Sequence, residues 1–461
     1  MPLGRKYCQS RLFAEKRFET LLNARRPPAE DAALDCDVIV VGGGPAGSTV
    51  STLLKDNGYN VMVIEKSVHP RFHIGESLLP RNMPILRRLG VMESVAAIGV
   101  KKLGADFSVS GEAGHKVYDF SKALKPDEPT AFQVARAAFD EILLSNARAR
   151  GVDVMENTEA VNFRFGVDRV EVSVRATQSG IADDKVGEAD MRTLSGRFLI
   201  DASGRDTFLS SRMGLKKRDP RHSSAAVFSH FSDVERHAGE EAGNISIYWF
   251  DHGWFWVIPL AGDRTSVGMV CDPAFLKQRD GALEDFLLEG FSQCPQVARR
   301  MSKAVALDET RAAGNFSYRS SQIFGNRFLM VGDAYAFIDP VFSSGVYIAM
   351  QSAEFAADAI HGCLTKPSQA GKLLSRYERR VKTGISGFSW FIYRFRDPTM
   401  KFLFMNPSNK FGIQSAVISV LSGDVFGRTN LWPRLALFRA IYTMVKILDW
   451  LGLGSLVRQG K

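Results

Sequence analysis

The chain has 461 residues, of which 45% are hydrophobic and 24% are charged, an ordinary composition for a globular protein with a large core. No stretch approaches about 18 uninterrupted apolar residues and no recognised nucleic-acid motif is present, so we expect neither a membrane-spanning helix nor a nucleic-acid partner. The five cysteines are scattered, without CxxC or metal-ligand spacing. This pattern favours a reducing, cytoplasmic location and predicts neither a disulfide framework nor a metal site.

The first well-defined motif is GGGPAG at residues 42–47. An apolar run at 38–41 precedes it, a helical segment over about 46–57 follows, and a second apolar run at 59–64 leads into Glu65. Strand, glycine turn, helix, strand and acid therefore occur in the order of a dinucleotide-binding unit. A glycine turn without its context would be weak evidence, whereas this order predicts a nucleotide site.

Each position of this motif has a physical role. Gly42 permits the tight turn, Gly44 lets the backbone approach a pyrophosphate, and Gly47 allows close packing of helix on strand. The helix N-terminus at Ala46 offers free N–H groups to the anion, and Glu65 would accept hydrogen bonds from a ribose.

Two later segments identify the nucleotide. Each segment is predicted to be a strand that ends in a polar turn. They are FLIDASGRDT at 198–207 and NRFLMVGDAYAFIDP at 326–340. Together with GGGPAG they resemble the flavoprotein monooxygenase superfamily, in which the late aspartate, here Asp333, holds the ribityl chain of FAD. By the same resemblance Arg136 contacts the flavin, although a surface helix arginine is the plainer alternative. No second nucleotide fingerprint is present, so the chain is expected to lack its own NAD(P)H site, although this superfamily often binds NADPH without such a fingerprint. A protein without that site needs a separate flavin reductase to supply FADH2.

The stretch GWFWVIPL at 253–260 concentrates aromatic residues. The plain interpretation is a buried strand with Trp254, Trp256 and Ile258 on one face, ended by Pro259. The stretch also matches the WxWxIP motif of flavin-dependent halogenases. In that family the strand shields the flavin from the organic substrate, so that oxygen is not inserted directly.

A later segment resembles a second halogenase pattern, FxxPxxSxG. The segment is FIDPVFSSGVYIAM, and the matching residues are Phe337, Pro340, Ser343 and Gly345. The resemblance implies that Pro340 helps to shield the flavin and that Ser344 and Gly345 bind the halide, with Gly345 also against the cofactor. A tight turn packed on the flavin ring is the alternative.

The lysine that the family uses is expected in VKKLGADF, at Lys102. The resemblance implies that chloride or bromide attacks a flavin hydroperoxide, formed from FADH2 and O2, and that Lys102 holds the resulting hypohalous acid by a hydrogen bond or as a haloamine. The adjacent Lys101 indicates the alternative, a solvated loop. HPRFHIGESLLP at 69–80 resembles the corresponding segment of phenol and pyrrole halogenases. Phe342 stands where tryptophan halogenases carry a glutamate, which also favours a phenol- or pyrrole-like substrate, free or bound to a carrier protein.

Two other functions stay open at this point. The first is an FAD-dependent monooxygenase or a reductase resembling geranylgeranyl reductases, which share the GES segment and a similar tryptophan-and-proline strand. The second is a flavoprotein without catalysis that acts as a binding component.

The motif order predicts an α/β fold: a Rossmann-like FAD-binding domain with an antiparallel substrate-side sheet and a C-terminal helical region. We expect an N-terminal extension at 1–34, the FAD-binding core at 35–370 and the helical region at 371–461. A polar hairpin loop is expected at 177–196. The substrate-side sheet is expected to be interleaved with the core at about 111–131, 161–194 and 216–319.

The helical region is basic, with 15 Lys and Arg against 4 Asp and Glu in residues 371–461, and the whole chain has a net charge of +9. We expect a helix break at Asp397–Pro398. The final run, PRLALFRAIYTMVKILDWLGL, is apolar nearly all round, which predicts packing over the active-site entrance, with peripheral membrane contact as the alternative. The positive charge would suit an acidic carrier protein or an anionic membrane, and solvated helix faces are the plainer explanation.

Overall fold

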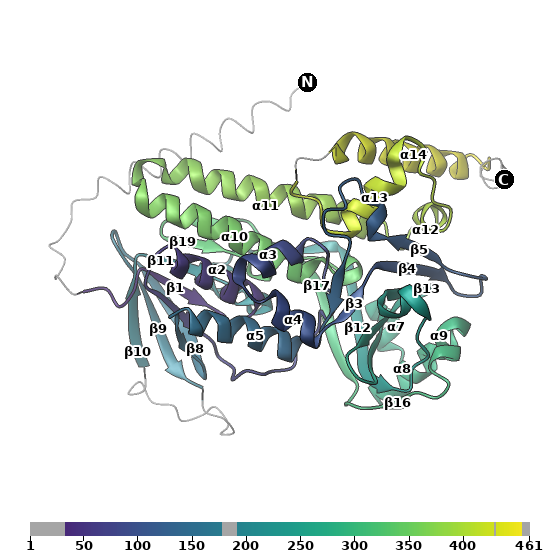
Figure 1. Ribbon diagram of the computed structural model, residues 1–461, viewed down its shortest axis with the longest axis horizontal. Coiled ribbons are helices and arrows are strands. Elements are labelled where there is room, and N and C mark those ends of the chain that lie inside the picture. Colours follow the sequence, from purple (N-terminus) through teal and green to yellow (C-terminus); the bar gives the residue numbers. More distant parts are fainter. Residues whose placement is uncertain (1–32, 178–190, 428–429, 454–461) are drawn as a thin grey trace.

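The computed structural model describes residues 33–177, 191–427 and 430–453, and it shows the expected α/β architecture (Figure 1). A six-stranded sheet has the order β18-β19-β11-β1-β2-β7, and its pairs are parallel except for β18 with β19. The central strands β1 and β2 are buried along their whole length, and apolar residues fill every position of both. The six strands are β1 Val38–Val41, β2 Val61–Ile64, β7 Asp153–Met155, β11 Phe198–Asp201, β18 Phe324–Gly325 and β19 Phe328–Met330.

Helix α2 packs on this sheet and contacts two further helices, α5 and α10. Helix α2 begins with a proline at its first position, where no backbone N–H is needed, and α10 follows directly on the loop after β20. These helices and their shorter neighbours are α2 Pro45–Asp56, α3 Asn82–Leu89, α4 Met92–Ile98, α5 Arg136–Ala149, α6 Phe208–Arg212 and α10 Ser344–Thr365.

A nine-stranded sheet forms the second half of the molecule, with the order β20-β17-β12-β15-β14-β13-β4-β5 and β16 paired to β12. All pairs are antiparallel except β13 with β4. Its strands are β4 Gly104–Val109, β5 Lys116–Asp119, β12 Lys216–Ser232, β13 Ile245–Phe250, β14 Gly253–Leu260, β15 Arg264–Cys271, β16 Val305–Ala306, β17 Arg311–Ser320 and β20 Ala336–Phe337. One face packs on the main core, and the other packs on α7 Pro273–Lys277, α8 Leu283–Ser292 and α9 Pro295–Arg300.

The expectation that residues 161–194 belong to the substrate-side sheet is wrong. Strands β8 Thr158–Phe165, β9 Val170–Ala176 and β10 Met191–Gly196 form a separate three-stranded antiparallel sheet (Figure 1). Residues 191–196, expected in a loop, form β10, because alternating side chains let Leu194 face the core opposite Val172. The rest of the expected loop, 178–190, lies outside the described residues.

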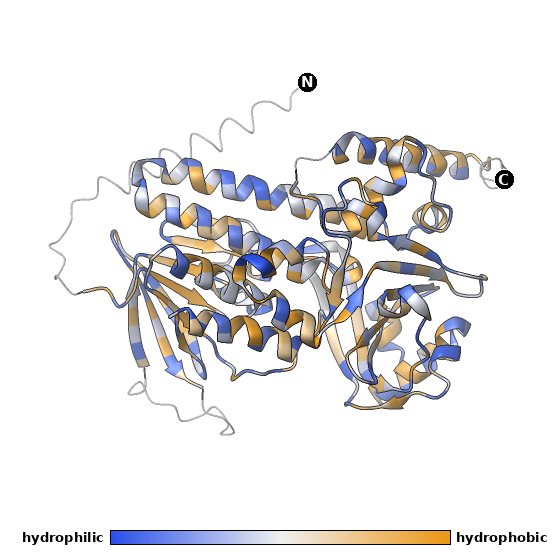
Figure 2. Ribbon diagram, in the orientation of Figure 1, coloured by the Kyte–Doolittle hydropathy of each residue, from blue (hydrophilic) through white to orange (hydrophobic). Residues whose placement is uncertain are grey.

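The C-terminal region is helical, as expected, with α11 Ala370–Ile392, α12 Pro398–Met405, α13 Ile413–Leu421 and α14 Leu431–Trp450. The predicted break at Asp397–Pro398 is confirmed, because the Asp397 side chain accepts the Thr399 N–H and caps α12. Apolar residues occur on both sides of α14 (Figure 2). Its inner side is buried, whereas Met444 is 54% and Trp450 83% exposed. No helix among the described residues has the length and hydropathy that crossing a membrane requires.

Candidate active site

The glycine turn has the geometry that its motif predicts. Gly42 has a φ of +103°, which L side chains rarely adopt. A Cβ at Gly47 would lie 1.8 Å from the Gly42 carbonyl oxygen, so only glycine lets the helix pack there. At Gly44 the nearest heavy atom to such a Cβ is Nη2 of Arg71, at 3.5 Å. Space is therefore open on the side where a pyrophosphate approaches the backbone.

A cavity of about 550 Å³ opens at this turn. Seven of the eight residues predicted to bind the cofactor line it, although they come from five separate parts of the chain. They are Gly42, Gly44, Ala46, Glu65, Arg136, Asp333 and Gly345. The eighth, Gly47, packs beneath the turn and is not part of the lining.

The acid at the end of β2 is held in place by backbone groups. Glu65 is buried and accepts hydrogen bonds from the N–H of Gly43 at 2.7 Å and of Ser67 at 2.8 Å. Because these two bonds orient the carboxylate at the cavity wall, its remaining lone pairs can accept from ribose hydroxyls.

Arg136 is not the surface arginine of the plainer alternative. It is 6% exposed at the start of α5 and forms a two-pronged ion pair with the buried Asp140, at 2.8 and 2.9 Å. Its third branch donates to the carbonyl oxygen of Ile74 at 2.6 Å. The guanidinium is therefore fixed between α5 and the segment 71–77, at the cavity wall.

Asp333 follows β19 at the opposite wall. Burial raises the pKa of Asp333 to about 6 despite the nearby Arg205 and Arg136. A hydroxyl-rich chain such as ribityl could supply the hydrogen bonds that a buried carboxyl group needs. The open approach at Gly44, the fixed Glu65 and this carboxyl group together fit FAD.

Lys102 lies on β3 Val100–Lys102, which pairs with β6 Ala131–Gln133. It is 1% exposed, and its Nζ donates to Ser77 Oγ at 2.9 Å and to the Leu78 carbonyl oxygen at 3.1 Å. Among the described residues no carboxylate pairs with it, and burial lowers its pKa to about 7. Lys101 is exposed. The structure therefore separates the two lysines that sequence alone left adjacent.

The aromatic strand is β14. Trp254, Trp256 and Ile258 point into the main core, as predicted, and all three are at most 7% exposed. The strand continues one residue beyond Pro259, because this position pairs only with β15 and needs no N–H on its other side. None of these side chains lines the cavity at the glycine turn.

An aromatic series connects β14 with that cavity. Trp256 contacts Phe228, with ring centres 5.9 Å apart, and Phe228 stacks on Phe72 at 6.2 Å. Phe72 itself lines the cavity. Two rings, those of Phe228 and Phe72, therefore separate the aromatic strand from the cofactor cavity.

The predicted halide-binding residues lie where α10 begins. Ser343 has a φ of +55° and turns the chain, so that Ser344 and Gly345 start the helix. Ser344 is 1% exposed and its hydroxyl has no hydrogen-bond partner among the residues that the structure describes, while Gly345 lines the cavity. Pro340 is half-buried in the preceding turn. Phe342 packs against Phe395 and Phe404, so the position is apolar in three dimensions as well.

Sequence reasoning missed a buried acid–imidazole group that adjoins the cofactor cavity through Phe72. His230 on β12 contacts Glu76 and Asp308 through its two ring nitrogens. The signal was present in part, because His230 lies two residues after Phe228 and therefore on the same buried face of the strand. Glu76 belongs to the GES segment, whose only signal in the sequence is its family resemblance. Nothing in the sequence connects Asp308 to them.

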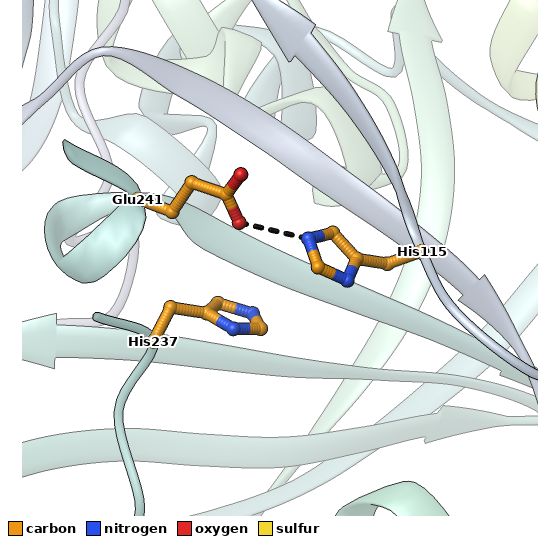
Figure 3. A group of neighbouring side chains, drawn as sticks. All are labelled: His115, His237 and Glu241. Carbon is orange, nitrogen blue, oxygen red and sulfur yellow. Dashed lines mark hydrogen bonds and ion pairs between the residues drawn. The ribbon is translucent and has the colours of Figure 1, made fainter. Parts of the chain in front are cut away.

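A second group of titratable side chains lies away from the cavity, between the turn before β5 and η4 Gly239–Gly243 (Figure 3). His115 pairs with Glu241 at 2.8 Å, and His237 lies 3.4 Å from Asp106. The two imidazole rings are stacked, with centres 4.9 Å apart and 29° between planes. A metal ion lies in the plane of each imidazole that binds it, so stacked rings suit an ion pair better than a metal site.

Comparisons with known proteins agree with this geometry. A family model for an FAD binding domain matches residues 35–384. The 1H-pyrrole-2-carbonyl-[peptidyl-carrier protein] chlorinase of Pseudomonas fluorescens is 28% identical over 86% of this chain and 91% of its own. The corresponding brominase of Pseudoalteromonas luteoviolacea is 33% identical over 70% of this chain and 77% of its own.

Two solved structures show the same fold. A flavoprotein/dehydrogenase from Cytophaga hutchinsonii superposes with a TM-score of 0.79 at 27% identity, over 90% of this chain and all of that one. The myxobacterial chondrochloren halogenase CndH superposes with a TM-score of 0.72 at 30% identity, over 88% of this chain and 89% of its own.

These findings define first an FAD-dependent oxidoreductase. More narrowly, the chain belongs to the flavin-dependent halogenases. The predictions of the family, the enzyme class and the FAD cofactor are confirmed.

Proposed function

We propose that the enzyme halogenates an electron-rich ring of pyrrole or phenol type and that the ring arrives on a carrier protein. The two relatives are named for a pyrrole-2-carbonyl group held on a peptidyl carrier protein. Phe342 and its aromatic neighbours leave no carboxylate at that position to polarise an amine-bound halogen, and an electron-rich ring needs less polarisation. The basic C-terminal region supports an acidic carrier as the partner.

The observation that carries this proposal is the environment of Lys102. Bound reduced FAD, with O2 and a halide ion, supplies an electrophilic halogen. Lys102 then holds this halogen for the ring, because a buried amine without a carboxylate partner is partly neutral near pH 7 and can act as a nucleophile.

The remaining predicted residues take supporting roles in the proposal. The unpartnered Ser344 hydroxyl and the first N–H groups of α10 bind the halide together with Gly345. The aromatic strand keeps the ring and bulk water away from the cofactor. It comprises Trp254, Trp256, Ile258 and Pro259, with Pro340 from the turn. FAD is bound by Gly42, Gly44, Ala46, Gly47, Glu65, Arg136, Asp333 and Gly345, and a separate flavin reductase reduces it.

The test supplies the purified enzyme with a flavin reductase, NADH, FAD, O2 and bromide. Phenols and pyrroles are offered both free and as carrier-bound thioesters. Mass spectrometry should show a bromine isotope doublet on a pyrrole or phenol, stronger for the carrier-bound form. A hydroxylated or reduced ring in place of the doublet would overturn the proposal in favour of a monooxygenase or reductase.

We also propose that the exposed side of α14 contacts anionic membranes peripherally. Apolar side chains recur along this side at helical spacing, including Leu437, Met444 and Ile447, and the helix lies in the basic region. Co-sedimentation with vesicles that contain phosphatidylserine should recover the wild type but not M444E/I447E. Equal recovery of both proteins would contradict this proposal.

A further inference from the structure

A buried imidazole on β12 connects the interior of the site with the surface. Nε2 of His230 lies 2.8 Å from Oε1 of Glu76, and Nδ1 lies 2.7 Å from Oδ2 of Asp308. Glu76 and His230 are 4% and 5% exposed, whereas the Asp308 side chain is 35% exposed. The three groups therefore form a continuous hydrogen-bonded path from solvent to a buried carboxyl group.

The inner end of this path lies next to the proposed chemistry. Glu76 directly precedes Ser77, whose hydroxyl accepts the hydrogen bond from Lys102. Gly75, on its other side, approaches the start of α10, because a Cβ there would lie 3.9 Å from Cγ2 of Val346. Phe72, which lines the cofactor cavity, makes a T-shaped contact with the His230 ring, with ring centres 6.0 Å apart.

Halide oxidation needs a proton at this place. In balanced form, FADH2, O2, one halide ion and one proton give FAD, one hypohalous acid and one water. The halide loses two electrons and FADH2 loses two, and O2 takes up all four. FADH2 contributes two of the three hydrogen atoms in the products, so the third must enter from solvent. A site closed against water needs a dedicated route for it.

We propose that Asp308, His230 and Glu76 form this proton route. His230 first binds a proton from solvent on Nδ1, beside the exposed Asp308. The resulting imidazolium breaks its Nε2–H bond as an O–H bond forms to the Glu76 carboxylate, which leaves a neutral ring with its proton on Nδ1. A flip of the ring restores the starting arrangement for the next turnover. Glu76 passes its proton to the oxygen atom that leaves as water. His230 acts through Glu76, so it is a positioning and relay residue. This role rests on the halogenation reaction proposed above.

The charges around His230 suit this role. Burial lowers its pKa, but the hydrogen bonds and charges of Glu76 and Asp308 outweigh burial, and its pKa is raised. Arg264 on β15 pairs with Asp308 at 2.7 Å, and Arg311 on β17 lies over the Phe72 ring. The imidazolium is thus favoured between two carboxylates, and protons are available at neutral pH.

The experiment compares wild type with H230Q, which keeps a hydrogen-bonding side chain but cannot relay a proton. H361Q is the matched control, because His361 bonds Tyr59 on the outside of α10. Hypobromous acid is trapped with phenol red between about pH 6 and pH 9, with bromide, O2 and reductase-supplied FADH2. We expect H230Q to be slower by about 10- to 100-fold. It should also lose the decline at alkaline pH, with unchanged FAD affinity, while imidazole partly restores H230A.

Two outcomes would overturn the relay. The first is a wild-type rate and pH profile in H230Q. The second is an equal loss at every pH, with no rescue of H230A, which would leave His230 only a structural role. This assay is independent of the proposals about the aromatic substrate and about Lys102. The trap measures hypobromous acid, whose formation requires neither the substrate ring nor the lysine, so either proposal can fail while the relay stands.

Discussion

Arg136 and Lys102 are both buried cations that donate to the same segment of chain, to the carbonyl oxygens of Ile74 and Leu78. They differ in their partners. Arg136 has a two-pronged carboxylate partner four residues away on its own helix, whereas no such partner was found for Lys102 among the described residues. The paired guanidinium keeps its charge and holds a fixed position at the cofactor cavity. The unpaired ammonium loses its proton more readily, and the neutral amine that results can act as a nucleophile toward an electrophilic halogen.

The largest expected effect is the loss of FAD binding when the glycine turn of the cofactor cavity is changed. A side chain at Gly44 would occupy the open approach of the pyrophosphate, so G44V should abolish FAD binding and all turnover. Fluorescence titration with FAD measures the loss. G371V, in an exposed part of α11 with nothing near the glycine, is the control. Stoichiometric FAD in G44V would disprove the role of the fingerprint.

The second largest effect is expected from Lys102, whose removal should affect halogenation and leave FAD binding unchanged. K102A should retain FAD binding and oxidation of FADH2 by O2, yet lower the halogenated product by more than about 100-fold, the range of a positioned catalytic group. Mass spectrometry of the product and FAD titration check both parts. Product at the wild-type rate would remove Lys102 from the mechanism.

A third prediction tests the paired cation. D140N leaves the buried Arg136 without its carboxylate, so the free energy of unfolding should fall by about 3 kcal/mol. Urea unfolding followed by tryptophan fluorescence provides the measurement. R136M/D140L, which removes both charges, should recover most of this loss. Equal losses in the single and double variants would contradict the ion-pair account.

The unpaired cation should show itself in the pH dependence of stability. The pKa of Lys102 is about 7 in the folded state and near 10.5 in the unfolded state, so the unfolded chain binds more protons between these values. Stability from this group therefore rises with pH across that window. K102M should flatten this rise and stabilise the protein at pH 7. A slope that is equally steep in K102M would show that Lys102 does not titrate in this window.

The smallest effect belongs to the neighbouring lysine. Lys101 is exposed on the other side of β3, so K101A should change the stability by less than about 0.5 kcal/mol and leave turnover unchanged. Parallel assays with K102A make the comparison within one strand. A comparable loss in K101A would show that the strand, and not the buried ammonium, matters.

The sequence by itself determined the parts that are encoded locally. The turn at 42–47 and the acid that follows it depend on glycine conformations and on strand and helix patterns within one short segment. The faces of β14 follow from the alternation of side chains along a strand. Motifs that recur in a family also located the regions of Lys102 and of Ser344, although not their surroundings.

Tertiary structure decided everything that depends on residues far apart in the chain. The sequence placed 161–194 in the substrate-side sheet, whereas β8, β9 and β10 form a sheet of their own, because strand pairing is set by packing against other elements. Burial separates Lys102 from Lys101, and His230 meets Glu76 and Asp308 across 154 and 78 residues. These pairs have no signature in local sequence, since only the folded core brings them within hydrogen-bonding distance and removes the water that would otherwise weaken their interaction.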